Sequence, residues 1–149
     1  MLKRFLKGFV YAAAGICRCV REERNFRFEL CAGALVVWLG ARYFAFSGTQ
    51  WAVLLLTVAA VLALEAVNSA IERAVAGPDA AHDAFAGQAK DMAAGAVLLV
   101  CCGAVGVGAA LFWQPSVWKE LFCGWAQYPY RPVLLAGYLT GSAVFVFHR

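Results

Sequence analysis

Residues 92–113 read MAAGAVLLVCCGAVGVGAALFW and contain no charged side chain. A helix needs about 20 mostly apolar residues to cross the roughly 30 Å hydrocarbon core of a bilayer. This stretch reaches that length on its own. It decides the fold, because a segment of this length without charge is predicted to cross the membrane as a helix.

Three further apolar runs extend this prediction to four spans. They cover residues 30–46, which Arg42 interrupts, residues 51–67, and the shorter residues 132–147. The chain of 149 residues is 63% hydrophobic and 15% charged, whereas soluble proteins average about 45–50% and about 25%. A soluble domain of this size could not bury so much apolar surface. We therefore expect an all-α membrane protein with a single domain, residues 1–149.

The segment before the first span has a different pattern. Between residues 2 and 20, apolar residues recur at spacings of three and four, and the basic residues lie largely on the other face. This pattern is typical of an amphipathic helix on the membrane surface. A signal peptide is rejected, because no long apolar region follows the charges.

The distribution of Lys and Arg sets the expected orientation, since cytoplasmic segments of membrane proteins are enriched in both. Seven of the 13 precede the first span, so the N-terminus is expected to be cytoplasmic. Residues 47–50 and 114–131 are then external links, and residues 68–91 and the C-terminus are cytoplasmic. The basic residues flank membrane segments and form no soluble patch, so nucleic acid is not expected as a partner.

A polar helix face continues directly from the second apolar run. Glu65 follows the apolar residues 61–64, where a carboxylate is costly to desolvate and is a functional candidate. Asn68 and Glu72 follow at i+3 and i+7, so the three residues share one face of a helix. We predict that this face lies at the cytoplasmic boundary of the membrane.

Two further pairs of charged residues reach the same boundary from other segments. Glu22 and Glu23 precede the first span, and Lys90 and Asp91 precede the third. Two carboxylates could hold a divalent metal through oxygen ligands, another could accept a proton from a hydroxyl, and a lysine could neutralise phosphate charge. This set favours phosphoryl transfer from a nucleotide to a lipid hydroxyl.

Other interpretations stay open at this point. Charged residues at helix ends commonly anchor spans at the interface and do nothing more. The pattern would also suit a small transporter or channel subunit, or a non-catalytic membrane protein. The sequence has no P-loop of the form GxxxxGK[ST], which is the usual phosphate-binding motif, so a nucleotide would need a different kind of site.

Four short motifs occur in a fixed order along the chain. They are RFLKGF at residues 4–9, EERNFR at 22–27, EAVNSAIE at 65–72 and AKDMAAGAVL at 89–98. Together they resemble the small prokaryotic lipid kinases of the diacylglycerol kinase and undecaprenol kinase family. The resemblance implies a surface helix and cytoplasmic motif over residues 1–29 and a three-span core over 30–113. Residues 114–149 are then an extension with a fourth span, which we expect to face lipid or alter contacts between subunits.

The resemblance also implies an activity and roles for individual residues. The family transfers the γ-phosphate of ATP to a lipid hydroxyl and uses Mg²⁺. By position in the motifs, Glu65 would be the general base, and Asn68 would help hold the base or the substrate. Glu23 and Glu72 would be the Mg²⁺ ligands that bring the metal to ATP.

Further residues would bind the nucleotide if the resemblance holds. Lys90 and Asp91 match positions that contact it, and Arg4 and Tyr11 match positions that approach it from the surface helix. His82 would contact ATP from the loop. The family also implies a homotrimer with sites built between subunits, located in the bacterial inner membrane.

The sequence departs from the family pattern after the second metal ligand. Ala76 stands where the family has an acid, and the loop at residues 77–83 is altered; both changes bear on metal and ATP binding. The motif RNF at residues 24–26 is similar to undecaprenol kinases, whereas Glu29 is similar to diacylglycerol kinases. The expected lipid is therefore undecaprenol or diacylglycerol.

Overall fold

The computed structural model describes residues 2–77 and 84–148, and this part of the chain is built from helices alone. The bounds of the helices, in chain order, are α1 Leu2–Glu22, α2 Arg24–Tyr43, α3 Gly48–Ala74, α4 Ala84–Phe112, α5 Pro115–Gln127 and α6 Tyr130–Phe147. The prediction of an all-α membrane protein is confirmed. The amphipathic segment predicted over residues 2–20 corresponds to α1, which extends two residues further.

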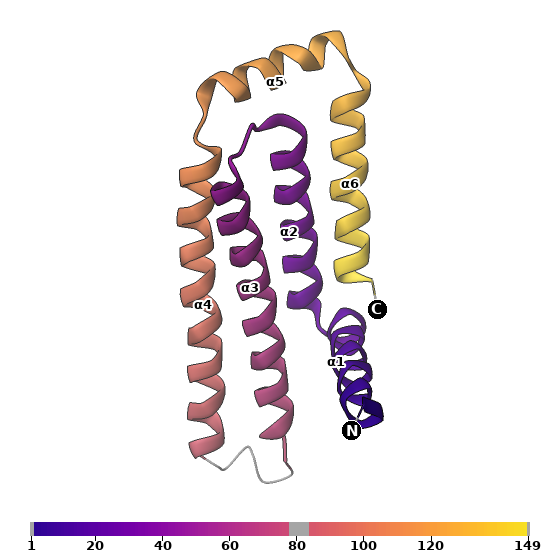
Figure 1. Cartoon of the computed structure of the whole chain (residues 1–149), viewed down its shortest axis with the longest axis vertical. Helices are drawn as coiled ribbons and strands as arrows, with labels where there is room; N and C mark the ends of the chain where they lie inside the picture. The colour runs from indigo at the N-terminus through magenta and orange to yellow at the C-terminus, as the bar shows by residue number, and fades with distance from the viewer. Residues whose placement is uncertain (1, 78–83, 149) are drawn as a thin grey trace.

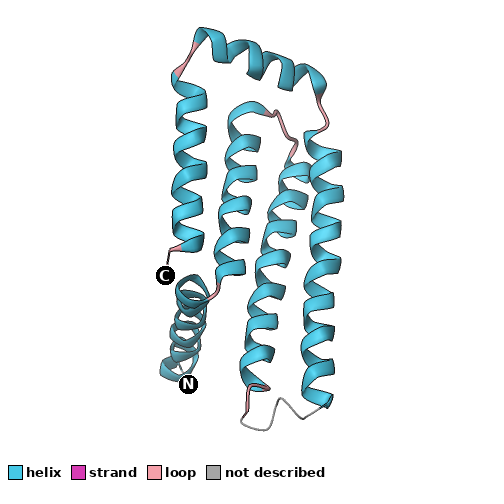
Figure 2. Ribbon diagram, turned by 180° about the vertical axis from the view of Figure 1, so that it is seen from behind, coloured by secondary structure: helices cyan, strands magenta, loops and turns pink. Residues whose placement is uncertain are grey.

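The four long helices lie side by side in the order α4, α3, α2, α6 (Figure 1). The helix α5 crosses one end of this row and joins α4 to α6, as both views show (Figure 2). At the opposite end, α1 packs against α2 and α3. We call these two ends the α5 end and the α1 end. The start of α2, the end of α3 and the start of α4 all lie at the α1 end.

Three of the described helices are long and apolar enough to cross a membrane, namely α3, α4 and α6. Most of their side chains face outward, and Leu99 on α4 is 76% exposed, as expected of a surface that contacts lipid. The span expected at residues 132–147 corresponds to α6. The division of the chain into a surface segment (residues 1–29), a three-span core (30–113) and an extension (114–149) stays a prediction.

The first predicted span differs from the structure in its position. We expected residues 30–46, but α2 begins at Arg24 and ends at Tyr43. It carries Arg24, Arg27 and Glu29 near its start and Arg42 near its end, so it is less apolar than the other long helices. It still lies parallel to them (Figure 2). By length and composition α2 is not among the candidate membrane spans of the described residues, so the first predicted span stays a prediction.

The segment predicted as an external link, residues 114–131, contains the helix α5, which the sequence analysis did not anticipate. Pro115 occupies its first turn, a position where the missing proline N–H costs no hydrogen bond. The indole N–H of Trp118 donates to the carbonyl of Phe112 at 2.7 Å. The ring of Trp118 also packs edge-on against Phe44. These contacts fold α5 back over the α5 end of the bundle.

Close packing between α2 and α3 depends on a glycine. A Cβ atom added at Gly33 would come within 2.7 Å of a methyl carbon of Val58, so the two helices approach at this point because no side chain separates them. At the start of α3, Ser47 and Gln50 form a reciprocal capping box, which satisfies two backbone N–H groups. The result is a fixed α2–α3 pair that presents Glu65 towards the start of α2.

Candidate active site at the α1 end

The corner between α1 and α2 is tied to the end of α3 by one arginine. Glu22 ends α1, and Glu23 has an extended backbone conformation between the two helices. Arg73, in the last turn of α3, lies 2.7 Å from the Glu22 carboxylate. It also donates to Oε1 of Glu23 from two nitrogens, at 2.5 and 3.2 Å. One guanidinium on α3 thus neutralises two adjacent carboxylates at the corner between α1 and α2.

The polar face predicted on α3 is helical, with Glu65 and Asn68 buried and Glu72 exposed. Glu65 is 3% exposed and Asn68 is 8% exposed. The amide nitrogen of Asn68 donates to Oε1 of Glu72 at 3.1 Å, one turn further along. Within the described part of the chain, Oδ1 of Asn68 is buried and has no hydrogen-bond partner. A buried acceptor of this kind is costly unless a ligand or water donates to it.

Glu65 is where the charges of several segments meet. The side-chain amide of Asn25, in the first turn of α2, hydrogen bonds to its carboxylate, and Glu72 and Glu23 lie close enough to repel it. Three predicted site carboxylates, from α3 and from the α1–α2 corner, are therefore brought together. Glu65 is buried, Glu23 is half-buried and Glu72 is exposed. Like charges that lie close together favour a bound cation or proton between them.

Glu29 adds a fourth acid to this region from the second turn of α2. It lies close enough to Glu65 to repel it, and the thiol of Cys101 on α4 donates to its Oε1 at 3.7 Å. Its other oxygen is buried without a partner among the described residues. Glu29 also lines an apolar cavity of about 410 Å³ between α2, α3 and α4, whose walls include Val36, Val58 and Ala104.

Other predicted site residues are not joined to this cluster within one chain. Arg4 and Tyr11 on α1 are exposed, as are Lys90 and Asp91 in the second turn of α4. Among the described residues, no hydrogen bond or ion pair connects these four side chains to the carboxylates. His82 lies outside the described residues.

Three residues that complete the cluster, Asn25, Glu29 and Arg73, were not among the predicted site residues. Asn25 lies inside the EERNFR motif, so its place in that motif could have identified it as a site residue. Glu29 stands directly before the apolar run at residues 30–46, the same kind of position that singled out Glu65. Arg73 carried no such signal, because only the packing of α3 against the α1–α2 corner brings it to Glu23.

The carboxylates fit a magnesium ion that arrives with phosphates. The described residues contain no group of three or more His, Cys, Asp or Glu side chains that could hold a metal by themselves. Mg²⁺ is usually bound by one or two carboxylates together with water and substrate phosphates, so it does not need such a group. Glu23 and Glu72 both repel Glu65, and a divalent cation would relieve this repulsion.

Comparison with known proteins agrees with this chemistry. Residues 10–112 match the family described as prokaryotic diacylglycerol kinase. The chain is 36% identical over 111 residues to an undecaprenol kinase of Bacillus subtilis, a match that covers 74% of this chain and 89% of the relative. It is 38% identical over 111 residues to a diacylglycerol kinase of Synechocystis sp., covering 74% of this chain but only 63% of that protein. No solved structure matches the chain.

Proposed function

The chain belongs to the prokaryotic diacylglycerol kinase family and is an integral-membrane lipid kinase, and we propose that it transfers the γ-phosphate of MgATP to the hydroxyl of undecaprenol. Diacylglycerol is the alternative acceptor. The match that spans most of a relative is with an undecaprenol kinase, which supports the first lipid. The product would be undecaprenyl phosphate, or phosphatidic acid for the alternative.

The observation that carries this proposal is the setting of Glu65. It is buried, hydrogen bonded to Asn25 and surrounded by other acids, which suits a group that takes up a proton. In the proposed step the lipid O–H gives its proton to the Glu65 carboxylate. The lipid oxygen forms a bond to the γ-phosphorus, the bond from that phosphorus to the bridging oxygen breaks, and ADP leaves. Asn68 holds Glu72 and offers its unpartnered oxygen towards the substrate.

Glu23 and Glu72 are the proposed ligands of the metal. When bound, Mg²⁺ would neutralise phosphate charge, which is the main requirement of phosphoryl transfer. Glu23 reaches this position from the α1–α2 corner and Glu72 from the last two turns of α3. The amide of Asn68 orients the Glu72 carboxylate, as groups around a metal ligand commonly do.

The proposed nucleotide-binding residues support an assembly of several chains. Arg4, Tyr11, Lys90 and Asp91 are exposed, and within residues 2–77 and 84–148 no hydrogen bond or ion pair joins them to the carboxylates. We propose a homotrimer in which these residues meet a neighbouring chain's cluster. The proposed location is the bacterial inner membrane, with the α1 end in the cytoplasm, where ATP is available.

The apolar cavity between α2, α3 and α4 supports a lipid acceptor. Glu29 is the one charged residue in its lining, and it lies towards the α1 end, near Glu65. A lipid whose chain occupies this cavity would place its hydroxyl at the acids. A mostly apolar cavity with a few polar groups in its lining, here Glu29, Thr57 and Cys101, is the arrangement expected for a long-chain alcohol.

The test of this function uses purified protein in mixed micelles with radiolabelled ATP and Mg²⁺. Undecaprenol and diacylglycerol are supplied in parallel reactions. We expect label in undecaprenyl phosphate. Label in phosphatidic acid alone would replace undecaprenol with diacylglycerol, and label in neither lipid, with the protein folded, would favour a chain whose activity was lost around Ala76.

Arg73 offers a separate prediction, because it competes with a metal for Glu23. We expect Arg73→Gln to lower the Mg²⁺ concentration for half-maximal activity by up to about fivefold, since solvent-exposed ion pairs contribute little. The measurement is a magnesium titration of lipid phosphorylation. Arg18→Gln is the matched control, because Arg18 contacts Glu22 at 3.9 Å and does not contact Glu23. An identical titration curve for Arg73→Gln and the native protein would contradict the competition.

A further inference from the structure

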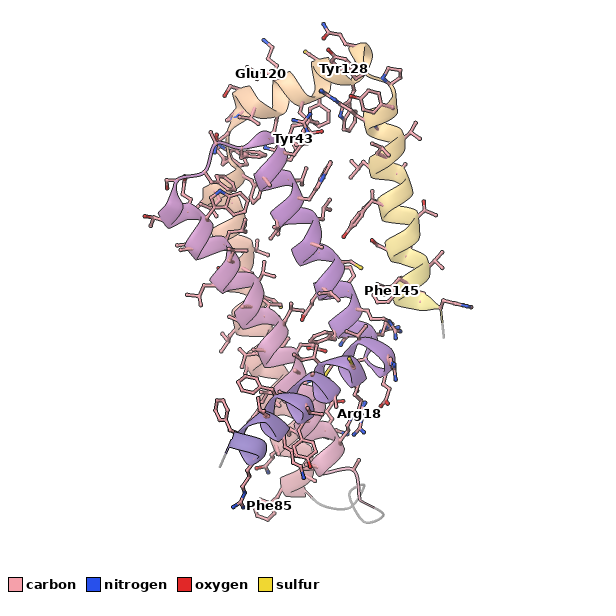
Figure 3. All side chains as sticks on the ribbon, turned by 45° about the vertical axis from the view of Figure 1, so that its right-hand side comes forward. Arg18, Tyr43, Phe85, Glu120, Tyr128 and Phe145 are labelled. Atoms are coloured by element: carbon pink, nitrogen blue, oxygen red, sulfur yellow. The ribbon has the colours of Figure 1, made fainter. Side chains whose placement is uncertain are left out.

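The end of α6 lies against the start of α2, on the side of the corner opposite Arg73. One guanidinium nitrogen of Arg27 donates to the carbonyl of Val146 at 2.9 Å, and the other donates to the carbonyl of Arg21 at 2.9 Å. The Arg27 guanidinium also lies 5.9 Å from the ring centre of Phe145. Figure 3 labels Phe145 in the last turns of α6, beside the start of α2.

Both carbonyls that Arg27 contacts are at the C-terminal ends of helices. Arg21 is in the last turn of α1, and Val146 is in the last turn of α6. The last carbonyls of a helix lack partners within that helix, and they carry the negative end of its dipole, which favours a cation. Arg27 is only 7% exposed, and a charge this buried is retained only where such groups compensate it.

Arg27 is also one helical turn from Glu23. Its backbone N–H donates to the carbonyl of Glu23 at 3.2 Å, so one backbone hydrogen bond joins the two residues. The Glu23 carboxylate is held from the other side by Arg73 on α3. The corner that carries the proposed metal ligand is therefore fixed by α3 on one side and by α6, through Arg27, on the other.

We propose that Arg27 is a positioning residue that acts with the end of α6 to hold Glu23 in place for the metal-bound nucleotide. This inference rests on the proposed role of Glu23 as a metal ligand. It gives the C-terminal extension a part in the reaction, although the family match ends at residue 112. The extension completes the α1 end and is more than an additional helix facing lipid.

The test compares Arg27→Lys with Tyr138→Phe in the full-length protein. Lysine keeps the charge but lacks the planar fork that donates to two carbonyls at once. Tyr138→Phe also removes a hydrogen bond from α6 to α2, since the Tyr138 hydroxyl donates to the carbonyl of Cys31, but it does so two turns away from the corner. Two properties are measured: Mn²⁺ binding with a non-hydrolysable ATP analogue, by electron paramagnetic resonance, and the KM values for lipid and MgATP.

We expect Arg27→Lys to weaken Mn²⁺ binding about tenfold, at the low end of effects seen for groups that orient metal ligands. The KM for MgATP should rise with it, while the KM for lipid stays within about twofold. Tyr138→Phe should leave all three values unchanged. If both variants change them in parallel with their thermal stability, α6 has only a structural role and the inference is overturned.

A double-variant cycle with Glu23→Asp separates this inference from the proposed function. If Arg27 acts through Glu23, the effects of Arg27→Lys and Glu23→Asp on Mn²⁺ binding are expected to be non-additive. Additive effects would overturn the positioning role and leave the metal assignment intact. If Glu23→Asp alone does not alter Mn²⁺ binding, the metal assignment of Glu23 fails and this inference fails with it.

Discussion

Glu65→Gln is expected to lower kcat by about 10²- to 10⁴-fold, the range that general base catalysis contributes, while nucleotide binding is retained. Glutamine has the same shape and can keep the contact with Asn25, but it cannot accept a proton at neutral pH. The measurements are turnover of the lipid under saturating MgATP and equilibrium binding of an ATP analogue.

The control for this prediction is Glu120→Gln, which removes a carboxylate from α5 at the other end of the molecule (Figure 3). It should retain full turnover. Glu65→Gln is also not expected to destabilise the fold, because it removes the repulsion of Glu65 by Glu23 and Glu72. Unchanged turnover in Glu65→Gln would eliminate Glu65 as the base.

The second large effect is expected for the metal ligands. Glu72→Ala and Glu23→Ala should each raise the Mg²⁺ concentration for half-maximal activity by more than about tenfold, because changes in groups that merely orient a ligand already cost 10- to 100-fold. A high concentration of Mg²⁺ should restore part of the activity. The measurement is a magnesium titration of lipid phosphorylation at fixed ATP.

Glu22→Ala is the matched control for this pair. Glu22 is adjacent to Glu23 and also contacts Arg73, but it is not a proposed ligand, so its loss removes the same charge from the same corner. We expect its half-activating concentration to stay within about twofold of the native value. A normal response to Mg²⁺ in both Glu72→Ala and Glu23→Ala would disprove the metal assignment.

Much of the fold followed from local patterns along the chain. The apolar stretch at residues 51–67 predicted a span that lies within α3, and the stretch at 92–113 predicted one that corresponds to α4, which ends one residue earlier. The three- and four-residue spacing at the N-terminus predicted α1. These predictions succeeded because length and periodicity determine whether a helix can lie in or on a membrane. The helix α5 was missed, since its short aromatic segment becomes stable by packing on Phe44, a residue distant in sequence.

Some residues of the candidate site could likewise be predicted from local spacing, whereas others are brought together only by tertiary packing. Glu65, Asn68 and Glu72 could be placed on one face from their spacing alone, because that face is set by the geometry of a single helix. The contacts of Arg73 with Glu23 and of Arg27 with Val146 join residues 50 and 119 positions apart. No local pattern encodes such pairs. They arise from the packing of α3 and α6 on either side of the α1–α2 corner, where buried or adjacent charges must find partners.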